Sequence, residues 1–213
     1  MEIIIDTHIL QSRIVVARFL PNPNHRAHDT QHLAVKMLIN HVFPDTRGEY
    51  MHRQSGAPYI RGNENVNLSI THTRGIAAIA VNDCMPVGID VEQVSNRVVR
   101  VLPRVAHQSE IRTLNVNENL PEAYTTAWTA KEAIYKAIQG DGIDFANHII
   151  INFPTPIMYD ITGTVQPIRY TAQEHRTLQA HCYDVVSLPL ISSGPFAQAS
   201  HILTVAVAQK SCQ

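Results

Sequence analysis

Val87-Gly88-Ile89-Asp90-Val91-Glu92 is a run in which apolar and acidic side chains alternate. This pattern is typical of a β-strand, because successive side chains of a strand point to opposite faces of the sheet. Asp90 and Glu92 therefore share one face, and the run predicts a strand with two neighbouring carboxylates. The competing interpretation is that both are only the polar side of a half-buried strand.

A second informative segment is Trp128-Thr129-Ala130-Lys131-Glu132-Ala133-Ile134-Tyr135-Lys136. It is typical of a helix, in which positions four apart are neighbours, so Trp128, Glu132 and Lys136 form one stripe. Glu132 and Lys136 could be only a surface ion pair, and Trp128 only core. Together with Asp90 and Glu92, however, Glu132 completes a set of carboxylate oxygens of the kind that Mg²⁺ prefers.

These segments resemble motifs of the 4′-phosphopantetheinyl transferases. The pattern Gly-Ile-Asp-Val-Glu followed by Trp-x-x-Lys-Glu-Ala-x-x-Lys is similar to the two metal-site motifs of that family. Upstream, Gly56-Ala57-Pro58 and residues 68–75 resemble its coenzyme-binding Gly-Lys-Pro and Ser-x-Ser-His-Thr motifs. Downstream, Gly140-Asp141-Gly142 resembles its glycine turn, so that four motifs occur in the family's order.

The resemblance implies an α+β fold built as a pseudo-dimer, with two similar halves that each pack a small antiparallel sheet on a long helix. Family members of this length look like two shorter units fused into one chain. We therefore expect residues 1–85 to form an amino-terminal half with coenzyme A contacts, and residues 86–213 a carboxy-terminal half with the metal-binding motifs. The active site would lie between the halves, and the chain would act as a monomer.

The activity implied by the resemblance is transfer of 4′-phosphopantetheine from coenzyme A to a serine of an apo acyl, peptidyl or aryl carrier protein. The other product is 3′,5′-ADP. The expected cation is Mg²⁺, which Mn²⁺ could replace, and its expected ligands are Asp90, Glu92 and Glu132. The metal would grip the coenzyme pyrophosphate and make its phosphorus easier to attack.

Four residues are the expected catalytic groups. Glu132, or Glu110 through a water molecule, would take the proton from the carrier serine. Lys136 and Lys131 would stabilise charge on the phosphoryl oxygens and on the departing nucleotide. From its own position in the sequence, Glu110 is equally well a solvated helix carboxylate.

The coenzyme contacts implied by the resemblance are Gly56, Pro58, Thr71, His72, Thr73 and Arg26. Hydroxyl and backbone donors suit phosphate oxygens, although His72 alone could be a turn or core histidine. Ala57 stands where many relatives have a lysine, so one charge contact to the nucleotide phosphates is missing. Arg26, Arg61 or Arg74 could compensate for it.

A basic stripe is predicted beside the metal site. Arg97, Arg100 and Arg104 recur at helical spacing. Because carrier proteins are typically acidic around their serine, the resemblance makes this stripe a docking candidate. The alternative is an ordinary solvated face.

The composition is that of a folded globular chain, with 45% apolar and 16% charged residues among 213. A formal net charge of −1 provides no global field that would favour nucleic acid. The three cysteines are scattered, which argues against a disulfide framework and fits a reducing compartment. No segment reaches the ~18 apolar residues of a membrane span. We expect a cytoplasmic protein with neither a membrane nor a nucleic-acid partner.

Along the chain, local patterns predict both strands and helices. Strands are expected at 3–5, 13–19, 66–71, 76–81, 87–92, 149–153, 177–188 and 201–208, and helices at 27–42, 97–114 in whole or in part, and 121–139. In the first helix, one face is expected to hold Leu33, Met37, Leu38 and either His41 or Val42.

Two other functions stay open from the residues alone. A different Mg²⁺-dependent phosphotransferase or phosphohydrolase would also use clustered carboxylates and a lysine, but it gives no reason for the Thr71-His72 segment. A non-catalytic coenzyme A or carrier-binding protein would have no need of the full set Asp90, Glu92, Glu132 and Lys136.

Overall fold

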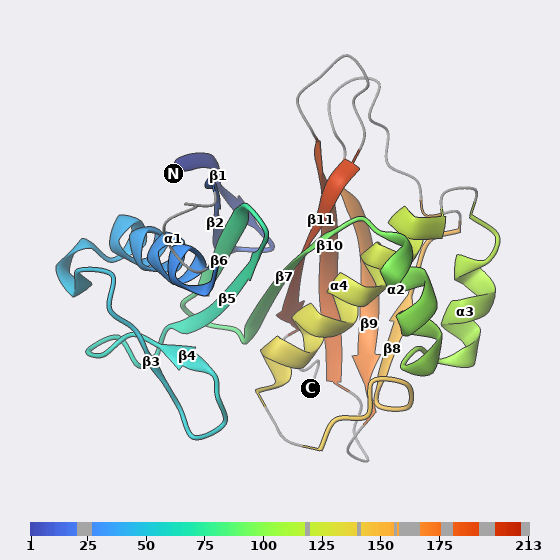
Figure 1. The fold of residues 1–213 in the computed structure, drawn as a ribbon. Coiled ribbons are helices and arrows are strands. Elements are labelled where there is room, and N and C mark those ends of the chain that lie inside the picture. Colours follow the sequence, from blue (N-terminus) through green and yellow to red (C-terminus); the bar gives the residue numbers. More distant parts are fainter. Residues whose placement is uncertain are drawn as a thin grey trace.

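The fold is α+β, as the computed structural model shows for residues 1–20, 27–117, 120–139, 142–155, 157, 167–175, 181–191 and 199–209. Within these residues there are four α-helices and three antiparallel sheets (Figure 1). The expected fold class is therefore confirmed. The division at residues 85 and 86 and the pseudo-dimer relationship stay predictions.

The first large sheet has the strand order β1-β2-β6-β5. Its strands are β1 (Glu2–Ile9), β2 (Ser12–Arg18), β5 (Asn67–Thr73) and β6 (Ile76–Asn82). Helix α1 (Ala27–Val42) packs on one face of it and is followed by the short 3-10 helix η1 (Pro44–Thr46). A two-stranded hairpin of β3 (Met51–His52) and β4 (Pro58–Tyr59) leads back to the sheet.

The second large sheet has the order β7-β11-β10-β9-β8. Its strands are β7 (Val87–Gln93), β8 (Ile149–Asn152), β9 (Ile168–Glu174), β10 (His181–Ile191) and β11 (Ala199–Ala208). Helix α4 (Leu120–Ile138) crosses this sheet (Figure 1). The remaining helical segments are α2 (Asn96–Val101), η2 (Leu102–Arg104) and α3 (Gln108–Leu114).

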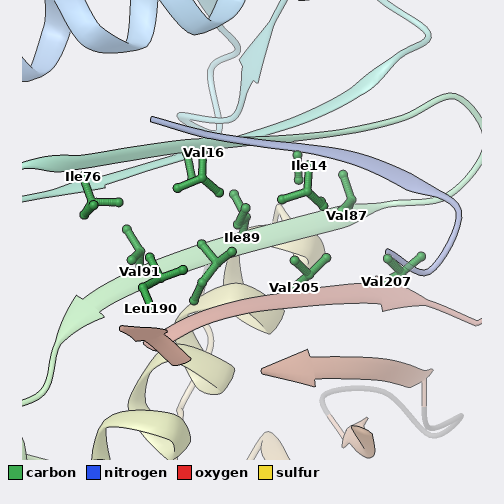
Figure 2. Close-up of a cluster of buried hydrophobic side chains, with 12 residues drawn as sticks. Ile14, Val16, Ile76, Val87, Ile89, Val91, Leu190, Val205 and Val207 are labelled. Carbon is green, nitrogen blue, oxygen red and sulfur yellow. The ribbon is translucent and has the colours of Figure 1, made fainter. Parts of the chain in front are cut away.

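The two large sheets share one hydrophobic core (Figure 2). Ile14 and Val16 of β2 point toward Val87, Ile89 and Val91 of β7, and all five are buried. The intervening β2 side chains, at positions 15 and 17, pack instead against α1. Because side chains alternate along a strand, β2 is thus buried on both faces, between α1 and the second sheet.

Hydroxyl groups of β5 join the sheets along the edge of β7 that does not pair with β11. The backbone N–H of Ile89 donates to Ser69 Oγ at 3.0 Å, and that of Val91 donates to Thr71 Oγ1 at 3.3 Å. Buried backbone donors need such partners, because leaving one unpaired costs about 1–3 kcal/mol. Ser69 and Thr71 therefore add polar contacts to the hydrophobic core that joins the two large sheets.

Helix α4 approaches β7 closely at Gly88. A Cβ atom added to Gly88 would overlap the carbonyl oxygen of Ala133 and come within 2.9 Å of the Ala137 nitrogen. The helix face toward the sheet is made of small residues, with Ala130, Ala133 and Ala137 all buried. The absence of side-chain bulk on both elements is what permits this approach.

The secondary-structure predictions are confirmed for most elements, with two corrections. The segment 97–114 is helical in part, as predicted, because α2 ends before Pro103 and α3 starts anew at Gln108. Leu33 and Met37 are 58% and 44% exposed, whereas Val35 and Ile39 join Leu38 in the core, so the buried face of α1 is rotated from the expected one. Strand β9 was not predicted, and residues 177–180 of the expected strand 177–188 lie outside the described residues.

None of the described helices combines the length and apolar composition that spanning a membrane requires.

Gly88→Ala is expected to lower the free energy of unfolding by about 3 kcal/mol, because the added methyl group meets helix backbone rather than a side chain that could move away. Urea denaturation monitored by circular dichroism measures the loss. Gly62→Ala is the matched control: its φ is +83° but its new Cβ would meet nothing within 4 Å, so only about 1 kcal/mol of backbone strain is expected. Equal losses in the two variants would contradict the close-contact assignment.

Candidate active site

A cavity of about 430 Å³ lies where β5, β7, α4 and the β3–β4 hairpin meet. Its size falls within the range typical of small-molecule sites. It is lined by Tyr50, His52, Ser55, Gly56, Ala57, Pro58, Leu68, Ser69, Ile70, Thr71, His72, Asp90, Tyr135, Lys136 and Gln139. Both large sheets contribute to this wall, so the cavity depends on their docking.

Asp90 and Lys136 form an ion pair in the cavity wall. Lys136 Nζ donates to Asp90 Oδ1 at 2.7 Å and to the Ile89 carbonyl at 3.2 Å. Thr71 Oγ1 donates to the same carboxylate oxygen at 3.0 Å. The other oxygen, Asp90 Oδ2, is buried and has no hydrogen-bond partner among the described residues. A buried carboxylate oxygen without a partner is a position that a cation or an external donor would satisfy.

Two further carboxylates share this electrostatic environment. Burial first, and then the negative charge of Asp90, raises the pKa of Glu92. The same two causes, in the same order, raise the pKa of Glu132, and Lys136 opposes the shift. The negative charge of Asp90 therefore acts on both glutamates, and the charge of Lys136 opposes the shift of each pKa.

These carboxylates fit a hard cation by their chemistry. Three oxygen donors with excess negative charge, one of them an unpartnered buried oxygen, form the kind of ligand set that Mg²⁺ takes. Across the part of the chain that the structure describes, no three His, Cys, Asp or Glu side chains form a ready-made metal cluster. The metal assignment thus stays a prediction. It requires the side chains of Glu92 and Glu132 to come closer to Asp90.

Lys131 and Glu110 do not reach the cavity. Lys131 Nζ lies 2.9 Å from Glu110 Oε2 and donates to the carbonyls of Phe145 at 2.7 Å and Ile149 at 2.6 Å, and neither charged side chain has exposed surface. Burial lowers the pKa of Lys131, and the charge of Glu110 opposes that shift. The expectation that Lys131 meets phosphoryl oxygens is therefore wrong, because its ammonium group is enclosed and already bonded to Glu110 and to two backbone carbonyls.

Glu110 has a structural task of its own. One oxygen accepts from the backbone N–H of His107, the N-cap residue of α3, at 2.7 Å, and the other accepts from that of Ile151, within the edge strand β8, at 2.8 Å. A carboxylate so enclosed cannot take a proton from a serine in the cavity. Of the two expected general bases, Glu132 and Glu110, only Glu132 therefore remains a candidate.

The coenzyme-contact expectations divide into three groups. Gly56, Pro58, Thr71 and His72 line the cavity. The single hydroxyl proton of Thr71 is already donated to Asp90, so this side chain can accept but not donate to a phosphate. Thr73 lines a neighbouring pocket instead, and Arg26 lies outside the described residues.

The neighbouring pocket, of about 460 Å³, lies on the side of β7 toward α2. Glu92, Arg97 and Trp128 line it, so it opens beside one of the site carboxylates. Arg97, Arg100 and Arg104 are all exposed, although Arg104 belongs to η2 rather than to the same helix. The basic stripe thus starts at this pocket.

Sequence reasoning missed Tyr50, His52 and Ser69 as cavity residues. Ser69 could have been found, because it lies two residues from Thr71 and a strand places such residues on one face. Tyr50 precedes the two-residue strand β3 and His52 ends it, and a strand this short has no periodicity that could be recognised.

A carboxylate paired with a lysine at a cavity, as Asp90 and Lys136 are here, is typical of a class of phosphate-handling enzymes. Within this class, residues 86–186 match the family model described as the 4′-phosphopantetheinyl transferase superfamily. This match supports phosphopantetheine transfer in general and hence a transferase. No curated protein matches the chain significantly.

Glu132→Gln is expected to stabilise the protein at neutral pH in metal-free buffer. A carboxyl group whose pKa is raised in the folded state favours folding only while it is protonated, so its ionised form weakens the fold as pH rises above the ordinary value of 4.5. The urea midpoint of the variant should exceed that of the wild type at neutral pH, and the difference should shrink as pH falls below that value. Glu2→Gln, on the exposed β1, is the control; a gain in both variants, or in neither, would refute the unfavourable ionisation of Glu132 in the folded protein.

Proposed function

We propose that this protein transfers the 4′-phosphopantetheine group of coenzyme A to a serine of an apo carrier protein and releases 3′,5′-ADP. The observation that carries the proposal is Asp90: its carboxylate pairs with Lys136 at a cavity and keeps one buried oxygen without a partner. Asp90 and Lys136 both lie within residues 86–186, the segment that matches the transferase superfamily. A fused, two-unit chain acting as a monomer is part of the proposal.

Coenzyme A would lie in the cavity with its phosphates toward Lys136. Gly56 and Pro58 of the β3–β4 hairpin form the opposite wall. Lys136 is 28% exposed, so its ammonium can reach a ligand oxygen while it remains next to Asp90. A lysine placed in this way stabilises the charge that develops on phosphoryl oxygens.

Asp90 Oδ2, Glu92 and Glu132 would hold Mg²⁺, or Mn²⁺ in its place. When bound, such an ion would neutralise the pyrophosphate and polarise its phosphoryl oxygens. Burial and the negative charge of Asp90 raise the pKa of both glutamates, and the positive charge of the ion would offset both effects.

The reaction needs one proton transfer and one displacement at phosphorus. The serine oxygen of the carrier attacks the β-phosphorus of coenzyme A, while the bond from this phosphorus to the bridging oxygen breaks and 3′,5′-ADP leaves with that oxygen. Glu132 accepts the serine proton, and the raised pKa of its carboxyl group makes it a better acceptor at neutral pH. Nothing in this sequence requires a covalent intermediate on the protein.

The carrier would dock on the side of the neighbouring pocket. Arg97 lines that pocket together with Glu92, and Arg100 and Arg104 continue the exposed basic surface away from it. An acidic carrier surface would be attracted there, with its serine next to the site carboxylates.

One experiment tests the function against its two alternatives. The protein is incubated with coenzyme A, Mg²⁺ and a panel of apo carrier proteins, and the carriers are weighed by mass spectrometry. A phosphopantetheine adduct on carrier serine supports the proposal. Coenzyme hydrolysis without an adduct would indicate a phosphohydrolase, and binding without either product would indicate a non-catalytic protein.

Asp90→Asn is expected to reduce the transfer rate about a hundredfold or more, because a neutral amide replaces the anionic ligand that lies beside Lys136. The rate of adduct formation should be measured at limiting and at saturating Mg²⁺. Asp45→Asn, in the exposed turn η1, is the control and should retain wild-type activity. Near-normal transfer by the Asp90 variant at limiting Mg²⁺ would remove the metal-site assignment.

Arg100→Glu is expected to raise the Michaelis constant for the carrier about tenfold at low salt, because reversing an exposed charge slows association with an acidic partner. The constant for coenzyme A should stay unchanged. Arg47→Glu, exposed next to η1, is the matched control. If both variants behave alike, or if added salt does not shrink the difference from wild type, the basic stripe is only a solvated face.

A further inference from the structure

A row of buried hydroxyl groups crosses strands β9, β10 and β11 and ends on α4, which lies across this sheet in Figure 1. The Tyr170 hydroxyl of β9 lies 2.6 Å from Ser187 Oγ of β10, which lies 2.7 Å from Thr204 Oγ1 of β11. Thr204 Oγ1 in turn lies 2.7 Å from Thr129 Oγ1 of α4. Ser187, Thr204 and Thr129 have no exposed surface. These four residues are here named the hydroxyl row, and the proposed reaction assigns no role to them.

The hydroxyl row has one consistent order of donors. Thr129 Oγ1 donates to the Thr125 carbonyl at 3.1 Å, and since a carbonyl can only accept, the one proton of this hydroxyl is committed there. Thr204 must then donate to Thr129. By the same argument, Ser187 donates to Thr204 and Tyr170 donates to Ser187. Burial raises the pKa of Tyr170 above its ordinary value, so the phenol keeps the proton with which the order begins.

Thr204 connects the hydroxyl row to the strand that carries Asp90. In the pairing of β11 with β7, Thr204 lies directly opposite Asp90, and cross-strand neighbours point to the same face of a sheet. On α4, Thr129 and Lys136 are seven residues apart, nearly two full turns, so their side chains share one face of the helix. The Thr129–Thr204 contact and the Lys136–Asp90 pair are therefore two connections from one helix face to adjacent strands.

Core stability alone gives no reason for the hydroxyl row. Replacing both partners of a buried hydrogen bond by apolar groups of the same shape is nearly neutral for folding. What such a network provides is a single arrangement, because any other arrangement leaves buried hydroxyl groups without partners. A shift of the helix by one residue is about 1.5 Å along its axis, which is enough to break the Thr129–Thr204 contact.

The other contacts of α4 fix its position along the axis less closely. The buried helix face toward the sheet consists largely of alanines, whose side chains form shallow ridges that resist sliding weakly. Gly88 sets the distance between helix and strand rather than the position along the axis. Lys131 reaches Glu110 through a long stem with several torsions, whereas a threonine side chain has one stiff torsion.

We propose that Thr129 and Thr204 are positioning residues for the transfer reaction: their hydroxyl contact fixes α4 along its axis relative to β7. Lys136 and Glu132 move with the helix and Asp90 moves with the strand, so this contact sets how the three groups meet. The inference rests on the proposed function for the reaction. Neither threonine is among the residues that line the cavity. Because a misplacement of about 1 Å can lower a rate about a hundredfold, a partial release of the helix should lower it about tenfold.

The first measurement compares variants of α4 for the rate of carrier modification at saturating coenzyme A and Mg²⁺. Thr129→Val keeps the shape and loses the hydroxyl, so the rate should fall about tenfold while the Michaelis constant for coenzyme A changes less than about twofold. Thr129→Ser keeps the hydroxyl and loses a buried methyl group, so the rate should be retained although the free energy of unfolding drops. Thr125→Val is the matched control, because this buried hydroxyl donates to the Pro121 carbonyl of its own helix.

A purely structural role for Thr129 predicts a different ranking of these variants. The rate would then follow the urea midpoint, and the least stable variant would be the slowest. If Thr129→Val transfers as fast as Thr125→Val, or if Thr129→Ser is as slow as Thr129→Val, the positioning role is overturned. Thr204→Val and Thr204→Ser make the same comparison from β11, should Thr129→Val fail to fold.

The second measurement needs neither coenzyme, carrier nor divalent cation. The strength of the Lys136–Asp90 pair is obtained from urea unfolding of Lys136→Met, Asp90→Asn and the double variant, as the part of their effects that is not additive. In the Thr129→Val background this coupling should fall to less than about half of its wild-type value, whereas Thr129→Ser and Thr125→Val should leave it unchanged. An unchanged coupling in the Thr129→Val background would overturn the inference.

The two measurements separate the inference from the proposed function. If the wild-type protein modifies no carrier but the coupling falls as expected, the transferase is overturned and the threonines still position the ion pair. If all variants modify carriers at equal rates and the coupling is unchanged, the function stands and the positioning role is overturned.

Discussion

The contact between Gly88 and the backbone of Ala133 sets the distance between β7 and α4, and the site is built on that distance. Because the glycine has no side chain, the helix lies close enough for Lys136 to reach both the Ile89 carbonyl and the Asp90 carboxylate. A bulkier residue would push the helix outward and separate the charges that define the site. The glycine of the strand motif therefore acts through packing, whereas the neighbouring aspartate acts through charge.

The same strand joins the two large sheets. On its apolar face Ile89 and Val91 enter the shared core, and along its free edge their backbone N–H groups are accepted by the hydroxyls of Ser69 and Thr71. Thr71 also donates to Asp90, so one hydroxyl couples the docking of the sheets to the orientation of a site carboxylate. If this contact between the sheets were lost, Thr71 would no longer orient the Asp90 carboxylate, whether or not a ligand is bound.

Periodicity explains what the sequence could predict. Strand β7 and helix α4 have clear two- and four-residue repeats, which predict that Asp90 and Glu92 share one face of the strand and that Glu132 and Lys136 share one face of the helix. The structure pairs Asp90 with Lys136, whereas Glu92 lines the neighbouring pocket. Lys131 was misjudged, because being next to Glu132 in sequence puts it about 100° around a helix, toward the core rather than the cavity. The places of Tyr50 and His52 in the cavity wall depend on a short hairpin, and no local pattern encodes such tertiary contacts.

The two ion pairs of α4 show how burial divides structural from functional charge. Lys131 and Glu110 are fully enclosed, and each is satisfied by backbone partners as well as by the other, so removing one would leave a buried charge at a cost of about 3–5 kcal/mol. Lys136 and Asp90 lie at a cavity, and one carboxylate oxygen is left without a partner. An enclosed ion pair whose hydrogen-bonding groups all have partners holds the helix in place. An ion pair at a cavity that has an unpartnered oxygen can instead bind a ligand or a cation. The Lys131–Glu110 pair fixes one side of α4 to the core. The other side of the helix can therefore hold the incompletely satisfied Lys136–Asp90 pair.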